Sequence, residues 1–484
     1  MIYQTIRRVG LLFLSCCLLS ACGCNKPEED SDGGETPPPI GPVASDIMTY
    51  LTEPSRYIYF KKQTVPVNFS GSQPGHQIIT VDSSISYQSI DGFGYTLTGG
   101  SAGLINGLGA TEKDNILKEL FLADSASIGV SYLRISIGAS DLDSAPFSYN
   151  DIPVNETDFN LNHFSIDKDR VHLIPILKKI VQLNPTIKIM GSPWSAPAWM
   201  KTNKEFKGGN LRKDCYRVYA QYIANYIKAM KAEGIVIDAI TPQNEPLHGG
   251  NNPSMVMEAM EQADFIKNHL GPVFAAENIK TKIIIYDHNA DRPDYPLAIL
   301  DDPDAAKYVD GSAFHLYGGT INALSQVHDA HPDKHIYFTE QWVGGPGNFG
   351  EDLKWHTENL IIGATRNWSR NVLEWNLAAD PNYDPHTPGG CTSCLGALTI
   401  GSNLTRNVAY YIIAHASRFV RPGSVRINSS QTSSLLTVAF KNPEGKKVLI
   451  VLNKESGSQT FSIKFGVRYA TATLGGGAVA TYVW

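Results

Sequence analysis

An alternation of strands and helices constrains the fold of this 484-residue chain more than any other feature. From about residue 90 to 400, short apolar runs alternate with longer runs whose apolar residues recur at helical spacing. Eight runs are strand-like, over residues 89–98, 132–138, 186–193, 236–243, 282–288, 311–317, 336–342 and 370–377. Such alternation predicts a parallel sheet, and the count of eight favours a closed (β/α)8 barrel over residues 89–410.

The alternative to a closed barrel is a doubly wound open sheet. The sequence has no glycine fingerprint for dinucleotide binding, which counts against that alternative. The segment 215–234 illustrates the helical pattern, with apolar residues at helical spacing and a glycine, Gly234, at its end.

The segments on either side of the barrel have a different pattern. Residues 46–88 and about 415–484 lose the helical periodicity, which predicts β-rich segments over 46–88 and 411–484. The run 434–465 alternates in the manner of strands, with turns at "NPEG" and "NKESGS". This pattern is typical of a β-sandwich. Because β-rich segments flank both ends of the barrel, we expect them to form one side domain together.

The N-terminus is predicted to be a targeting segment rather than part of the fold. Arg7 and Arg8 precede a short apolar run, 11–19, and "LLSAC" then resembles a bacterial lipobox ending at Cys22. We expect a signal peptide over 1–21, a lipid on Cys22 and a flexible tether over 22–45. This predicts export and anchoring to the outer membrane, facing the surface or the periplasm; an ordinary signal peptide cleaved nearby is the alternative.

Composition excludes some classes of protein. The 47 acidic and 41 basic residues give a formal net charge of −6, so the composition does not indicate the excess positive charge of a nucleic-acid-binding protein. The cysteines do not form a disulfide scaffold. The pair Cys391 and Cys394 in "CTSC" is open to a local disulfide, to two free thiols or, least favoured, to a metal site that lacks ligands.

Polar residues interrupt the ends of the predicted strands, where a barrel of this type builds its active site. Two of them are carboxylates after the fourth and seventh strands, and paired carboxylates in an aromatic cleft fit glycoside hydrolysis. One must be protonated and the other ionised, and Arg134 is the candidate cation for the ionised one. The set is Arg134, Asp141, Trp194, Asn244, Glu245, His315, Tyr317, Glu340 and Trp375.

Each of these residues also has a structural interpretation. A lone Glu after a strand is commonly a first-turn residue of a helix, favoured by the helix dipole. Arg134 can serve as an ion-pair partner, His315 as a core histidine, and the tryptophans as packing. Their joint placement at strand ends favours the functional interpretation, in which the two indoles, Trp194 and Trp375, offer apolar faces to a pyranose.

Seven ordered motifs resemble glycoside hydrolase family 30, which includes lysosomal glucosylceramidase. They are "DGFGYTLTGGSA", "YLRISIGASDL", "GSPWSAPAWMKTN", "ITPQNEP", "FHLYGG", "YFTEQWVGG" and "VLEWNLAADP", and the resemblance runs from about residue 60 to the end. It implies a retaining glycosidase with a (β/α)8 barrel and a β-sandwich side domain.

The resemblance also implies roles for individual residues. Glu245 would be the acid/base, held protonated, and Glu340 the nucleophile, with Arg134 beside it. Asn244 would contact the sugar 2-hydroxyl. A glucose subsite would be lined by Asp141, Trp194, His315, Tyr317 and Trp375. No metal or other cofactor is required, because two carboxylates and water complete the reaction.

The loop after the eighth strand indicates the substrate within the family. Its Pro- and Gly-rich sequence, "AADPNYDPHTPGGCTSCLGALTI", resembles the β-1,6-glucanases, and a disulfide there would stiffen the cleft rim. β-1,6-Glucan is therefore the expected substrate. The alternatives are a β-glucosidase or glucosylceramidase-like activity, a xylan-directed member, and a non-catalytic surface lipoprotein that binds glycans.

Overall fold

A computed structural model describes residues 45–124, 126–153 and 155–484 of the chain. The predicted signal peptide, Cys22 and all of the tether before residue 45 lie outside the described residues. In the part of the chain that the structure describes, no helix is long and apolar enough to cross a membrane.

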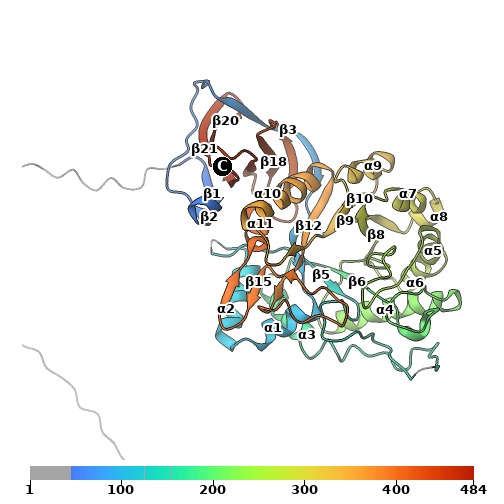
Figure 1. Cartoon of the computed structure of the whole chain (residues 1–484). Helices are drawn as coiled ribbons and strands as arrows, with labels where there is room; N and C mark the ends of the chain where they lie inside the picture. The colour runs from blue at the N-terminus through green and yellow to red at the C-terminus, as the bar shows by residue number, and fades with distance from the viewer. Residues whose placement is uncertain (1–44, 125, 154) are drawn as a thin grey trace, which may run out of the picture. The chain divides into compact units, whose positions relative to one another are not determined.

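Eight parallel strands close into a barrel, as the sequence predicts (Figure 1). The β10 strand pairs with both β9 and β12, and β12 with β4, so the sheet has no free edge. The barrel strands are β4 (Gly92–Thr96), β5 (Tyr132–Ser136), β6 (Lys188–Ser192), β7 (Ala239–Ile240), β8 (Lys282–Ala290), β9 (Val309–Gly319), β10 (His335–Glu340) and β12 (Ser369–Asn376).

Helices alternate with these strands. The best predicted of them, α4 (Tyr216–Ala232), ends just before Gly234, whose positive φ of 85° suits a residue that follows a helix. The others are α1 (Gly99–Gly107), α2 (Ala110–Phe121), α3 (Leu173–Leu183), α5 (Ala259–Phe265), α6 (Gly271–Ala276), α7 (Asp294–Leu300), α8 (Pro303–Ala306), α9 (Ala323–Ala330), α10 (Phe349–His356) and α11 (Val408–Ser417).

The two ends of the described chain form one sheet, as expected from their shared pattern. Figure 1 shows the blue N-terminal strands beside the red C-terminal ones, because β1 pairs with β22 and β3 with β17 and β20. The strands are β1 (Met48–Glu53), β2 (Ile58–Lys62), β3 (Gln77–Ser89), β17 (Val425–Ser429), β18 (Leu435–Lys441), β19 (Lys447–Asn453), β20 (Gln459–Phe465), β21 (Arg468–Leu474) and β22 (Val479–Val483).

Alternate residues of β19 serve two cores. Val448, Ile450 and Leu452 belong to the large core cluster shared with the barrel and its helices. Leu449 and Val451 belong to the separate core of the side domain. The period of two therefore fixes this domain against the barrel. The boundary predicted at residue 410 falls within α11.

Short strands tie down the long loop after the eighth barrel strand. The β11 strand (Val343–Gly344) pairs with β14 (Cys394–Leu395). Beside them β13 (Ala378–Ala379) pairs with β15 (Leu398–Ile400), and β15 with β16 (Leu404–Arg406). The loop is thereby attached to the segment that follows Glu340, at the carboxyl end of the barrel.

Candidate active site

A cavity of about 280 Å³ opens at the carboxyl ends of the barrel strands. Six of the predicted site residues line it: Asp141, Trp194, Glu245, Tyr317, Glu340 and Trp375. Three more predicted residues belong to the same network: Arg134 donates to Glu340, His315 contacts Glu245, and the Asn244 side-chain oxygen accepts from Arg134 Nη2 at 2.6 Å. Five lining residues were not predicted: His248, Asn251, His288, Asn289 and Trp342. Cys391 and Cys394, expected at the cleft rim, also line the cavity.

Glu245 lies in a turn, not at the start of a helix. Its φ is +44°, a conformation that costs a non-glycine residue free energy and is frequent at functional sites. The Asn244 amide donates to the Pro193 carbonyl (2.8 Å) and the Glu245 amide to the Asp287 carbonyl (3.0 Å). After Glu245 the next helix begins only at Ala259, so the helix-dipole interpretation does not hold.

Glu340 ends β10 and is held by two donors. Arg134 Nη1 donates to its Oε2 at 2.5 Å, and the Tyr317 hydroxyl donates to its Oε1 at 2.9 Å. Arg134 is completely buried and lies within β5, not at the end of that strand as expected. The predicted proximity of Arg134 to Glu340 is therefore a direct ion pair.

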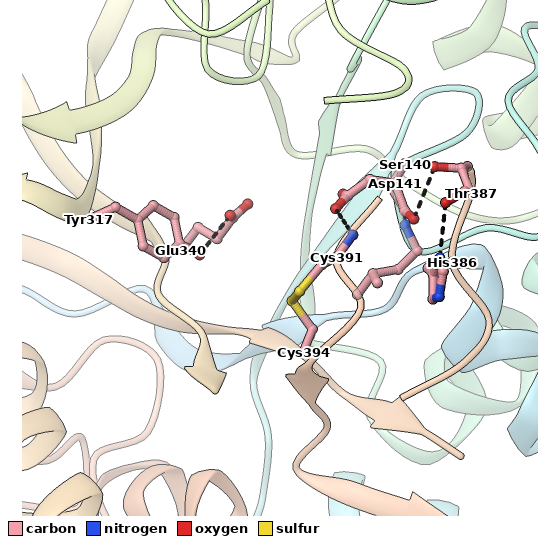
Figure 2. Close-up of a disulfide and its surroundings, with 9 residues drawn as sticks. Ser140, Asp141, Tyr317, Glu340, His386, Thr387, Cys391 and Cys394 are labelled. Carbon is pink, nitrogen blue, oxygen red and sulfur yellow. Dashed lines mark hydrogen bonds between the residues drawn. A yellow bond between two sulfur atoms is a disulfide. The ribbon is translucent and has the colours of Figure 1, made fainter. Parts of the chain in front are cut away.

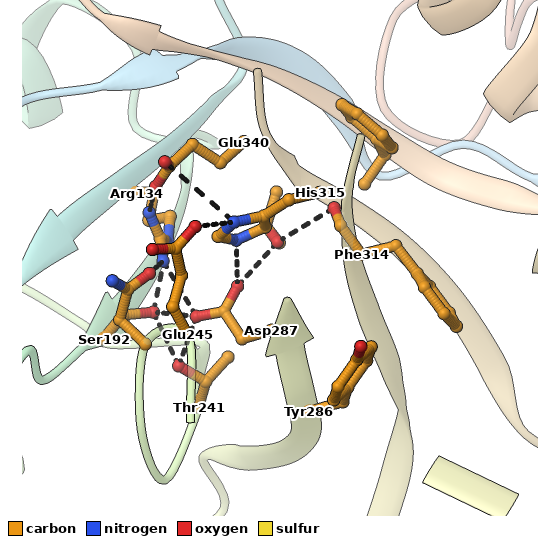
Figure 3. A network of polar contacts seen from close by, with 12 residues as sticks. Arg134, Ser192, Thr241, Glu245, Tyr286, Asp287, Phe314, His315 and Glu340 are labelled. Atoms are coloured by element: carbon orange, nitrogen blue, oxygen red, sulfur yellow. Dashed lines mark hydrogen bonds and ion pairs between the residues drawn. The ribbon is translucent and has the colours of Figure 1, made fainter. Parts of the chain in front are cut away.

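The two carboxylates lie close together across the mouth of the barrel (Figure 3). One oxygen of Glu245, one of Glu340 and one ring nitrogen of His315 lie within 4.8 Å of one another. Retaining glycosidases need carboxyl groups about 5–5.5 Å apart, whereas inverting enzymes need about 6.5–9.5 Å to admit a water molecule. The separation matches direct attack by a carboxylate.

Asp287 joins the whole network and was not among the predicted residues. Its side chain is fully buried and accepts hydrogen bonds from five donors (Figure 3). They are Arg134 Nη2 (2.8 Å), the hydroxyls of Ser192 (3.1 Å), Thr241 (2.7 Å) and Thr339 (2.7 Å), and His315 Nε2 (3.1 Å). Burial disfavours its charge, but Arg134 and these donors hold the pKa of Asp287 well below its usual range.

His315 carries a positive charge in this network. Burial opposes that charge, but Glu340 and the hydrogen bonds with Asp287 and Glu245 outweigh it and raise the pKa of His315 to about 9. Both ring nitrogens then donate, Nδ1 to Glu245 Oε1 at 3.2 Å and Nε2 to Asp287 at 3.1 Å. With both nitrogens occupied and Arg134 beside Glu340, we assign no metal to this cluster.

The pKa of Glu340 is raised and that of Glu245 is lowered, whereas we expected Glu245 to be the carboxyl held protonated. Burial raises the pKa of Glu340, and Arg134 and His315 offset this only in part. Burial acts the same way on Glu245, but the hydrogen bond and charge of His315 lower the pKa of Glu245 below its ordinary value. Without a bound sugar, the proton nearest Glu245 therefore resides on His315.

The two predicted indoles stack on each other. Trp194 and Trp375 have ring centroids 5.4 Å apart and are 1% and 3% exposed, and the Arg134 guanidinium lies 4.7 Å from the Trp194 centroid. Each ring therefore has a face covered by the other, and neither offers the freely accessible face that we expected. The accessible aromatic wall is Tyr317, which is 40% exposed, together with the partly buried Trp342.

A disulfide forms part of the cavity wall. Cys391 and Cys394 are bonded to each other, and the Cys391 amide donates to Asp141 Oδ2 at 3.3 Å (Figure 2). Burial, then the charges of Glu340 and Glu245, raise the pKa of Asp141 to about 7. The disulfide loop thus supplies a donor to an otherwise poorly stabilised carboxylate.

A closed barrel with two buried carboxylates at this spacing has the architecture of the retaining barrel glycosidases. The chain belongs to glycosyl hydrolase family 30, since residues 90–420 match the TIM-barrel domain of that family and residues 423–482 its beta sandwich domain. The chain is thus a glycoside hydrolase, as its motifs indicated.

Relatives cover most of the chain. It is 33% identical to an endo-1,6-beta-D-glucanase of Aspergillus fumigatus over 411 residues, which are 79% of this chain and 82% of that protein. A putative glucosylceramidase 1 of Caenorhabditis elegans is 32% identical over 403 residues, 78% of this chain and 76% of that one. The solved structure of the endo-beta1,6-glucanase BT3312 is 34% identical, with a TM-score of 0.84, covering 91% of this chain and 99% of that one.

Proposed function

We propose that the chain hydrolyses β-1,6-glucan with retention, with Glu340 as nucleophile and Glu245 as acid and base. The observation that carries this mechanism is the 4.8 Å grouping of Glu245, His315 and Glu340, with Arg134 paired to Glu340. Arg134 and Tyr317 hold the Glu340 oxygens in place for attack on the anomeric carbon.

The leaving group receives its proton from Glu245. His315 Nδ1 lies 3.2 Å from Glu245 Oε1 and carries a proton, and transfer of that proton along the hydrogen bond would leave a neutral imidazole beside a carboxylic acid. Glu245 then protonates the glycosidic oxygen as the glycosyl–Glu340 ester forms. In the second step Glu245 takes a proton from water, which attacks the ester, and the sugar leaves with its configuration retained.

The choice of β-1,6-glucan rests on relatives named for that activity, at 32–34% identity over most of the chain. The loop after the eighth strand, whose disulfide forms part of the cavity wall, also supports this choice, because its sequence resembles that of the β-1,6-glucanases. Product analysis on β-1,6-, β-1,3- and β-1,4-glucans, glucosylceramide and xylan tests the choice. Release of β-1,6-linked glucose oligomers is expected, and activity on glucosylceramide or xylan alone would overturn it.

The location is also a proposal. We infer from the "LLSAC" motif that Cys22 carries lipid and anchors the enzyme to the outer membrane. Metabolic labelling with radioactive palmitate should mark the wild-type protein and not Cys22→Ala, which should become free of the membrane. Equal membrane retention of both proteins would contradict the anchor.

A further inference from the structure

A second, larger cavity of about 870 Å³ lies beside the active site and has no role in the mechanism above. Its walls are α1, the segments 143–147 and 168–173, and the loop residues Asp380, Asp384 and Pro385. Among the described residues, none lines both cavities. The two border the same loop, which meets the second cavity at Asp384 and the active site at Cys391.

Two buried carboxylates face this second cavity with unused acceptor atoms. Asp143 is 7% exposed, and its Oδ2 accepts from the Ser140 amide (2.8 Å) and hydroxyl (3.1 Å). Its Oδ1 has no hydrogen-bond partner within the described residues. This oxygen lies against Gly99, because a Cβ built on Gly99 would be 1.8 Å from it. Asp169 is 5% exposed and accepts only from the Tyr149 hydroxyl, at its Oδ2 (2.6 Å).

Neither Asp143 Oδ1 nor Asp169 Oδ1 is among the fully enclosed, unpartnered side-chain atoms of the described residues, so a ligand in the cavity can reach both. The part of the chain that the structure describes has one cluster of three or more possible metal ligands, and it is the active-site group. A cation is therefore not the occupant that these two carboxylates indicate. Hydroxyl donors would satisfy them in either protonation state.

The remaining walls suit a sugar ring. Four glycines of α1 line the cavity together with Leu104: Gly99, Gly100, Gly103 and Gly107. A Cβ at Gly103 or Gly107 would meet no protein atom closer than 3.8 Å, so the helix leaves open space for a ligand there. Phe147 adds a half-buried aromatic wall, and the Lys168 ammonium lies 4.9 Å from its ring centroid. An apolar wall with a few convergent polar atoms is typical of small-ligand sites.

We propose that this cavity is a second saccharide-binding site, which holds a stretch of neutral glucan chain that is not being cleaved. Its position on the other side of the loop bearing the disulfide places it where a polymer extending from the active site can reach. The identity of the glucan rests on the proposed function, whereas the hydroxyl-binding chemistry rests on Asp143, Asp169 and Phe147.

The glycines allow the site to be blocked without touching the catalytic residues. A Cβ at Gly107 would meet nothing within 4 Å, and a Cβ at Gly103 nothing closer than the His172 ring at 3.8 Å. Gly107→Trp and Gly103→Leu therefore fill the cavity without forced contacts at the Cβ. Gly109→Trp is the matched control, because Gly109 is equally open but does not line the cavity.

Two measurements separate this site from the active site. The binding measurement uses the Glu340→Gln background, which keeps the polymer intact. In native gels containing β-1,6-glucan, the association constant obtained from retardation should be at least fivefold lower for Gly107→Trp and Gly103→Leu than for their parent. Gly109→Trp should match its parent. With Glu340 restored, all three should hydrolyse a small aryl β-glucoside within twofold of wild type.

Binding of β-1,6-glucan by both blocked variants as tightly as by their parent would overturn the second site. If wild-type protein neither binds nor cleaves β-1,6-glucan, the proposed substrate fails, and the same gels with β-1,3- and β-1,4-glucans test the cavity. Weaker retardation of the blocked variants on either glucan would support the site. Retardation of no variant, or equal retardation of all, would refute it.

Discussion

Replacing Asp287 with asparagine tests the electrostatic network most severely. The substitution keeps the size of the side chain but removes the charge between Arg134 and His315, which lie 2.8 and 3.1 Å away. The new amide also directs N–H groups toward atoms that are themselves donors. Removing one partner of a buried ion pair costs about 3–5 kcal/mol, so Asp287→Asn should lose about that much free energy of unfolding.

The loss should depend on pH in a defined direction. Because the pKa of Asp287 is depressed in the folded protein, its charge stabilises the fold fully above the unfolded pKa of about 4. As the pH falls below that value, the stability gap between wild type and Asp287→Asn should narrow by about 1.4 kcal/mol per pH unit.

Urea denaturation at pH 7 and at lower pH measures both effects. Ser192→Ala is the control, since it removes one neutral partner of the same carboxylate and should cost about 1 kcal/mol. A loss for Asp287→Asn no larger than that of Ser192→Ala, or a gap that does not change below pH 4, would refute the role assigned to the charge.

Three further predictions concern the site. Since the pKa of His315 is raised to about 9, its stabilising charge is fully present below the unfolded pKa of about 6.5 and is lost as the pH rises through 9. In wild type the urea midpoint should therefore fall between pH 6.5 and 9, and in His315→Gln this dependence on pH should be weaker. An equal dependence on pH in the two proteins would count against the charged imidazole. A double Cys391→Ser, Cys394→Ser variant should lose at most about 2 kcal/mol of stability, yet raise KM severalfold because the Cys391 amide no longer fixes Asp141; an unaltered KM would argue against that contact. Glu245→Gln should slow glucan hydrolysis by about 10²–10⁴-fold while sparing the first step with a dinitrophenyl glucoside, and azide should restore turnover; equal loss on both substrates would exclude Glu245 as the acid.

The barrel could be predicted because its signal is repeated eight times and each strand is bounded by a helix. The fourth strand shows the limit of that signal. Residues 236–243 read as a strand, but only Ala239–Ile240 belong to the sheet. Val236 is exposed, and beyond Ile240 the chain leaves the sheet so that the Asn244 amide can reach the Pro193 carbonyl.

The site could be predicted where its residues lie at a strand end or beyond it, as Glu340 and Glu245 do. Asp287 was missed because it lies inside a run that reads as an ordinary strand. There the β8–β9 register shifts between Tyr286 and His288, and both Tyr286 and Asp287 have positive φ, so the strand is irregular where the Asp287 carboxylate enters the network. Residue periodicity does not reveal a bulge of this kind.

The stacking of Trp194 on Trp375 was equally hidden, since Trp194 follows β6 and Trp375 lies in β12, and only the closed barrel brings them together. The same holds for the second cavity, whose walls come from segments more than 200 residues apart. Sequence patterns predict elements and their ends, whereas contacts between distant elements require the assembled fold.

Covalent trapping tests the central claim most directly. Incubation with an activated 2-deoxy-2-fluoro-β-glucoside should inactivate the enzyme, and mass spectrometry of its peptides should locate one fluoroglucosyl group on Glu340. Glu340→Gln should remain unlabelled under the same conditions. A label on Glu245 or on any other residue would contradict the mechanism proposed for this site.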